Sequence, residues 1–279
     1  MSNSIGIDLG AGVRALGVLA FRGPDAEKFL QGQLSADVSN LWAGTSMLAG
    51  FHSPQGRTIT VMMLARLSPE EIFAVLPREL IAEVSARLRK FVFRAKVSIE
   101  ESPLRVVGGA AGADPRGCYA FGWSDRQLLL KPEHKELELS TDSNAWDLAD
   151  LRAGLPQVYA ATSEAFVAQM LNLDLLGAIA FDKGCYTGQE VIARAHYRGR
   201  VKRRMQRFRN SGALLAPGDT AHSSDGRALS VVRVATAEDG TQEILAIGNF
   251  DDGARDSTES RSGAGSVEGP LPLPYTLPE

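Results

Sequence analysis

The sequence predicts an α+β protein that ends in a small antiparallel β-barrel or sandwich. Three observations lead to this fold class. The 279 residues are 44% apolar and 23% charged, which is typical of a globular chain long enough for two compact units. Up to about residue 200, short β-like runs are mixed with amphipathic helical segments. From Lys202 onward, short strands alternate with Pro-Gly-Asp, Ser-Asp-Gly and Glu-Asp-Gly turns.

Residues 13–21 predict the first strand, and Gly23-Pro24 then opens a short helix that ends at Gly32. Two amphipathic or Gly-bounded segments predict further helices, at 78–90 and 144–152. Ser53-Pro54-Gln55-Gly56 has the composition of a hairpin turn. The remaining strands before residue 200 are expected at 46–51, 58–64, 72–76, 97–99, 104–107, 118–123 and 127–130.

The barrel or sandwich is expected to contain strands at 203–209, 229–235 and 243–250. Between Asp251 and Pro270 only Ala254, Ala264 and Val267 are apolar, so this segment predicts a loop.

Charge and cysteine content exclude several classes of protein. A net charge of -3 argues against a globally cationic nucleic-acid coat. The two cysteines, Cys118 and Cys185, lie far apart and form neither a disulfide framework nor a zinc motif, so we expect a reducing compartment and no metal site. The most apolar longer segment, 165–181, is interrupted by polar residues. We therefore expect a cytoplasmic protein without a membrane span.

The glycine-rich run at residues 5–12 is similar to a phosphate loop of actin-like kinases. Its glycines do not have G-x-G-x-x-G spacing, and the chain has no Walker-type Gly-Lys-Ser/Thr motif. Nucleotide binding is therefore not supported.

The most informative segment is the run Lys183, Gly184, Cys185, Tyr186, Thr187, Gly188, Gln189 and Glu190. Thr187 and Glu190 have the spacing of a capping box, which predicts a helix from Gly188 to about Tyr197. Cys185 would lie just ahead of the helix N-terminus, where the helix dipole and the charge of Lys183 lower a thiol pKa. The alternative is a buried, inert cysteine in a Gly-bounded turn.

A cationic stretch follows this segment. Eight of the sixteen residues from Arg194 to Arg209 are Lys or Arg, and none is acidic. Such a stripe could hold RNA phosphates or a polyglutamate tail, and the interleaved aromatic residues could stack on bases. The alternative is a solvated basic face. The candidate patch consists of Arg194, Arg198, Arg200, Lys202, Arg203 and Arg204.

The run from Lys183 to Glu190 resembles the signature of the YgfZ family, folate-binding proteins linked to tRNA modification and related to the glycine-cleavage T-protein. Segments 23–37, 166–177 and 272–275 agree with the resemblance. It implies a fold like that of the T-protein (GcvT) aminomethyltransferase. Residues 1–200 would form two interleaved α+β units around a central opening, approximately 1–45 with 140–200 and 46–139. Residues 201–279 would form a C-terminal antiparallel β-barrel.

The resemblance also implies tetrahydrofolate, or another folate, in the central opening. Trp146 matches a family position that faces the folate, although its pattern also fits a core residue. A second family tryptophan is replaced by Leu16, and a common glutamate by Arg152. Because a guanidinium only donates hydrogen bonds, Asp147 or Asp150 could accept from the pterin instead, or Arg152 could pair with the glutamate tail.

T-protein enzymes use an aspartate on the early hairpin, where this chain has Gly56-Arg57-Thr58-Ile59-Thr60. A classical aminomethyltransferase is therefore disfavoured. The leading hypothesis is a monomeric folate-binding accessory protein with Cys185 as its functional thiol. Its partners would be tRNA or the iron-sulfur enzymes that modify tRNA. A cluster held by this chain would need a partner or a dimer. The alternatives are a folate-dependent aminomethyltransferase and a folate-independent RNA-binding or scaffold module.

Overall fold

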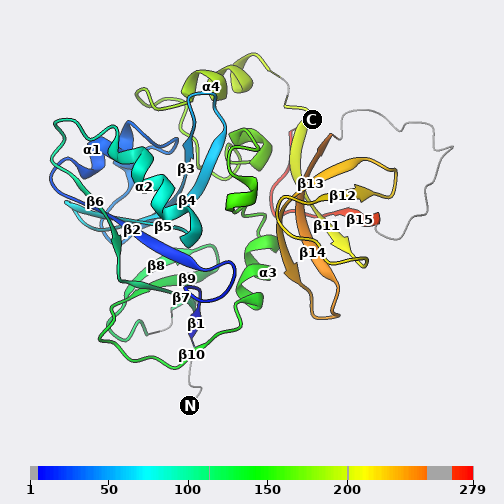
Figure 1. Cartoon of the computed structure of the whole chain (residues 1–279), viewed down its shortest axis with the longest axis horizontal. Helices are drawn as coiled ribbons and strands as arrows, with labels where there is room; N and C mark the ends of the chain where they lie inside the picture. Colours follow the sequence, from blue (N-terminus) through cyan, green and yellow to red (C-terminus); the bar gives the residue numbers. More distant parts are fainter. Residues whose placement is uncertain (1–5, 113, 200, 250–265, 279) are drawn as a thin grey trace.

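A computed structural model describes residues 6–112, 114–199, 201–249 and 266–278, and it confirms the predicted α+β class. The described strands form two five-stranded sheets and a closed five-stranded barrel. Figure 1 shows the barrel on one side of the molecule, the two sheets on the other, and helix α3 (Asn144–Arg152) between them. The boundary proposed at residue 201 falls between the last described helix and the first barrel strand.

The larger antiparallel sheet has the strand order β3-β4-β5-β2-β6. Its central strands are rich in β-branched and large apolar residues, which favour a half-buried pleated surface. Helices α1 (Ala26–Gln31) and α2 (Ile81–Arg89) cover this sheet with their apolar residues, together with η1 (Val38–Asn40) and η2 (Arg78–Leu80). The strands are β2 (Leu16–Arg22), β3 (Ser46–His52), β4 (Thr58–Ser68), β5 (Glu71–Pro77) and β6 (Ser98–Ser102).

The second sheet has the order β10-β1-β7-β9-β8. It packs against the first sheet through a shared core that includes Val18, Phe73, Leu130 and Trp146. Only β1 and β10 pair in parallel in this sheet. The strands are β1 (Gly6–Asp8), β7 (Arg105–Ala110), β8 (Tyr119–Trp123), β9 (Arg126–Lys131) and β10 (Leu139–Ser140).

The segment between α3 and the barrel contains little regular structure. It includes η3 (Ala160–Thr162), η4 (Ala168–Leu171) and helix α4 (Gln189–Tyr197). Its apolar side chains nevertheless form a core with α3 and the barrel. Within the described ranges, no helix has the length and apolar character that a bilayer crossing requires.

The barrel closes in the order β11-β14-β13-β12-β15, with β15 paired to both β11 and β12. Side chains such as Phe208, Leu229 and Ile244 fill its interior. Its strands are β11 (Arg203–Asn210), β12 (Thr220–Ser223), β13 (Ala228–Thr236), β14 (Gln242–Asn249) and β15 (Ser266–Leu271).

The predicted loop at 251–270 is wrong at its end, because residues 266–271 form β15. Residues 251–265 lie outside the described ranges. The short strands β1, β10 and β12 were not predicted either. The segment of β15 forms a strand because it pairs with β11 and β12 and so closes the barrel, although it contains few apolar residues.

Candidate functional site

A narrow inner cavity lies between the two sheets, α3 and the barrel, and its volume is about 30 Å³. Trp146 and Leu16 both line it, as the resemblance implies for two folate-facing positions. The ring of Trp146 is buried and packs so closely on Gly108 that a Cβ there would lie 2.3 Å from the ring. A cavity of this volume accommodates no more than a few waters, so as it stands it is too small for a pterin.

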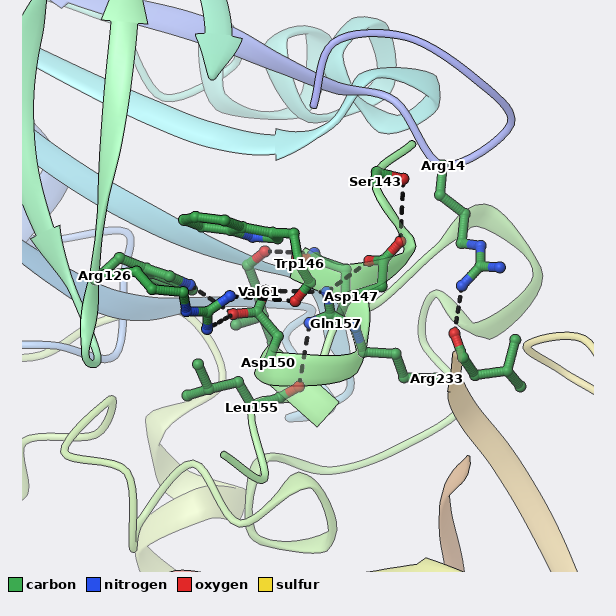
Figure 2. A network of polar contacts seen from close by, with 12 residues as sticks. Arg14, Val61, Arg126, Ser143, Trp146, Asp147, Asp150, Leu155, Gln157 and Arg233 are labelled. Carbon is green, nitrogen blue, oxygen red and sulfur yellow. Dashed lines mark hydrogen bonds and ion pairs between the residues drawn. The ribbon is translucent and has the colours of Figure 1, made fainter. Parts of the chain in front are cut away.

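Two carboxylates on α3 border the inner cavity, the buried Asp150 and the half-buried Asp147, and arginines pair with both of them. Figure 2 shows Arg233 of the barrel reaching Asp147 and Asp150 together, at 2.8 and 2.9 Å. Arg126 donates to the other oxygen of Asp150 at 2.7 Å, and its guanidinium lies 4.3 Å from the ring centroid of Trp146. The N–H groups of a pterin would therefore have to compete with an arginine for either carboxylate.

The charge of Arg233 is maintained by its neighbours in this cluster. Burial acts to lower the pKa of the Arg233 guanidinium, but the interactions with Asp150, Tyr159 and Asp147 together outweigh it, so that the pKa lies above its ordinary value. Arg233 therefore stays charged and joins the barrel to α3 through two charge-assisted hydrogen bonds.

A larger outer cleft of about 960 Å³ lies on the other side of Trp123 and Leu48, which line both spaces. Its wall is formed by the start of β3, the turn between β8 and β9, helix α3, the turn after β13, and the segment around Tyr275. Trp123 is held in place because its Nε1–H donates to Asp150 at 2.8 Å. The outer cleft has the volume of a typical small-molecule site.

Arg152 lines the outer cleft and not the inner cavity. Its guanidinium donates to Glu238 at 2.9 and 3.0 Å and to the buried Glu243 at 2.7 and 3.0 Å. The hydrogen bonds that Arg152 donates to Glu238 and Glu243 raise its pKa above the ordinary value. The structure thus brings Trp146 and Leu16 together, separates Arg152 from them, and commits Arg152 to two glutamates of the barrel.

The signature segment forms a loop that is anchored on both sides of Cys185. Lys183 Nζ donates to the carbonyls of Leu34 and Ala36 at 2.8 and 2.7 Å, and burial lowers the pKa of Lys183 to about 8. The Tyr186 side chain is buried in the core below the loop, and burial raises its pKa to about 12. Cys185 itself is exposed, so the alternative of a buried, inert cysteine is wrong. Cys185 lines neither the inner cavity nor the outer cleft.

The predicted capping box of Thr187 and Glu190 is wrong. Helix α4 begins at Gln189, and its N-cap is Gly188 with φ 82°, a left-handed conformation without any side-chain cap. Gly188 fits tightly against the β3–β4 turn, because a Cβ at this position would lie 2.5 Å from the carbonyl oxygen of Ser53. The glycine is needed for its backbone conformation and for this close approach.

Gly188→Ala is therefore expected to destabilise the protein by about 2 kcal/mol or more, from left-handed strain plus the clash with Ser53. Gly12→Ala is a matched control, since Gly12 has φ 86° but no atom within 4 Å of its Cβ position. It should cost only about 1 kcal/mol. Urea unfolding of both variants checks this, and equal losses would contradict the close approach at Gly188.

The candidate basic patch divides into two groups. Arg194, Arg198, Lys202 and Arg203 are exposed. Arg204 is buried and pairs with Asp174 at 2.8 and 2.9 Å, so its expected place in a surface patch is wrong. Arg200 lies outside the described residues.

Sequence reasoning missed three residues of the site: Trp123, Arg126 and Arg233. Arg126 and Arg233 carry no local motif, and their role depends on pairing with α3 from distant strands. Trp123 could have been noticed because the chain has only three tryptophans.

Comparison with known proteins assigns the chain to a family. No protein-family model matches the sequence. A protein of Haemophilus influenzae, described only as uncharacterized, is 33% identical over 196 residues, which cover 69% of this chain and 70% of the relative. The chain belongs to the family of this Haemophilus protein.

A solved structure identifies the fold that this family member adopts. The chain superposes on the glycine cleavage system aminomethyltransferase T of Bartonella henselae with a TM-score of 0.67, covering 89% of this chain and 79% of the other. The sequence identity is 13%, so the comparison concerns the fold. The predicted GcvT-like fold is confirmed.

Proposed function

We propose that the protein is a cytoplasmic, folate-binding accessory factor of the YgfZ type. In this proposal it supports tRNA modification by assisting iron-sulfur enzymes. The observation that carries the proposal is the signature loop. Lys183 and Tyr186 anchor the loop and Gly188 permits its turn, whereas Cys185 is exposed between the anchors. Among the described residues no hydrogen bond holds the Cys185 thiol, so a structural role does not account for it.

The outer cleft supports folate as the ligand. Its volume of about 960 Å³ fits a molecule of this size, and Trp123 offers an aromatic surface for a flat ring. Ser124 on its wall supplies a hydroxyl for the pterin edge, whereas the Asn144 amide is engaged with the backbone of Thr236. A folate would contribute its one-carbon chemistry, while these residues bind and orient it. Trp123 and Leu48 separate this cleft from the inner cavity with Trp146 and Leu16.

Two observations favour an accessory role over aminomethyl transfer. Thr58 and Thr60, in the stretch that matches the catalytic hairpin of the T-protein, are fully buried. The nearest carboxylates at the inner cavity, Asp147 and Asp150, are paired with arginines. A general base would need a free carboxylate at the ligand.

Titration of tryptophan fluorescence with tetrahydrofolate tests the ligand assignment. The chain has three tryptophans: Trp123 lines the outer cleft, Trp146 lines only the inner cavity, and Trp42 is exposed. We expect saturable quenching in the wild type that is largely lost in Trp123→Phe and retained in Trp42→Phe. If the quenching is lost in Trp146→Phe instead, the ligand binds in an opened inner cavity. A wild type that neither quenches saturably nor releases heat in calorimetry would contradict folate binding.

Glu238→Ala adds a test of the charge in the outer cleft. Glu238 is largely exposed and pairs with Arg152 on the cleft wall. Its removal leaves Arg152 with the buried Glu243 and makes the cleft less negative, so an anionic folate should bind more tightly. Unchanged affinity in this variant would mean that the glutamate tail lies elsewhere.

A further inference from the structure

Three aromatic rings gather where the signature loop meets the C-terminal end of α4. The rings of Phe181 and His196 are stacked, with centroids 3.8 Å apart and an interplanar angle of 17°. Tyr197 meets both rings edge-on, with centroids 6.0 Å from Phe181 and 4.7 Å from His196. Phe181 lies four residues before Cys185, so the contact holds the signature loop against α4.

Phe181 packs at the edge of the core between α3 and the barrel, whereas the other two rings face outward. Tyr197 is 68% exposed, and His196 is also exposed. A large exposed aromatic ring beside a fixed stack offers a flat surface on which a further ring can pack.

Exposed arginines lie on the same helix end as this aromatic cluster. Arg194 and Arg198 are one helical turn apart and exposed, and Lys202 and Arg203 follow at the start of β11. Among the described residues none of these four forms an ion pair, whereas the neighbouring Arg204 is paired with Asp174.

The nearby acidic side chains are few. Asp182 and Glu190 are exposed, and neither pairs with Arg194 or Arg198 within the described part of the chain. The surface thus combines an exposed aromatic stack with free positive charge, which favours an anionic ligand that carries flat rings.

We infer that the C-terminal end of α4 binds unpaired nucleotides of an RNA. Tyr197 would stack on a base, while Arg194 and Arg198 contact the flanking phosphates. Stacking requires a base that is free of its duplex neighbours, which is why a single-stranded loop fits better than a helix. The choice of RNA rests on the proposed function, and it gives this chain a direct contact with the RNA in addition to any contact with an enzyme.

Fluorescence anisotropy of the full chain with a labelled 12-nucleotide single-stranded RNA, and with the same strand in a duplex, tests the inference. We expect tighter binding of the single strand and about tenfold weaker binding by Tyr197→Ala. Trp42→Ala is the matched control, because Trp42 is 69% exposed, and it should bind as the wild type does. The double variant Arg194→Gln/Arg198→Gln should bind with a weaker salt dependence: the slope of log K against log salt concentration should fall in magnitude by roughly 1 to 1.5.

Three results would overturn the inference: equal affinity for duplex and single strand, wild-type affinity in Tyr197→Ala, or an equal loss in Trp42→Ala. A single-stranded DNA of the same sequence that binds as tightly as the RNA would overturn the assignment to RNA. None of these outcomes affects the folate titration, so failure of this inference can be told from failure of the proposed function.

Discussion

Arg233→Met should lower the free energy of unfolding by about 3 kcal/mol, because it removes the buried cation that Asp147 and Asp150 share: among the described residues Asp147 then has no cationic partner, whereas Asp150 keeps Arg126. The methionine keeps most of the volume and removes only the charge and its donors. Urea unfolding followed by circular dichroism measures the loss.

Arg22→Met is the matched control for this variant. Arg22 pairs with Glu71, but its side chain is 42% exposed, so its loss should cost at most about 1 kcal/mol. Adding Asp147→Asn to Arg233→Met should recover part of the stability, since the double variant no longer holds the carboxylate that lost its cation, and the Arg126–Asp150 pair stays intact. Equal losses for Arg233→Met and Arg22→Met would disprove the importance of the buried pairing.

Cys185→Ala should abolish function and leave stability within about 0.5 kcal/mol of the wild type, because the side chain is exposed. The measurement is complementation in cells that lack the gene, with thiolated tRNA nucleosides quantified by mass spectrometry. Thermal unfolding of the purified variant is recorded alongside.

Cys118→Ala provides the control on the second thiol. Cys118 is buried in a small cluster with Val107 and Leu129, and burial raises the pKa of its thiol. This variant should keep full function with a modest loss of stability. A stable Cys185→Ala protein that restores normal tRNA would show that the exposed thiol is dispensable, and the accessory role would then need another basis.

Local patterns predicted most elements of the fold but failed where distant partners decide the structure. The strands near β4 and β13 and the helix α3 follow from apolar runs and helix signals within a few residues. At β15 the strand forms because β11 and β12 both offer it hydrogen-bonding edges, which the sequence around Val267 does not reveal.

The same limit applies to the candidate site. The exposure of Cys185 and the position of Trp146 could be anticipated from the signature segment and the resemblance. The pairing of Arg204 with Asp174 could not, because it joins a barrel strand to an irregular segment thirty residues earlier. The capping box failed because Gly188 adopts a left-handed conformation that packs it on the β3–β4 turn, a contact 135 residues away at Ser53.

The closing role of β15 has a consequence for the order in which the protein assembles during synthesis. Strands β11 to β14 emerge from the ribosome first, as an open four-stranded sheet with β11 and β12 at its edges. These edges stay unpaired until residues 266–271 have emerged, after translation has passed residues 250–265. During this interval the nascent chain exposes two edge strands whose unpaired backbone groups can pair with another chain. Chaperone contact with the late nascent chain would be most valuable at this stage.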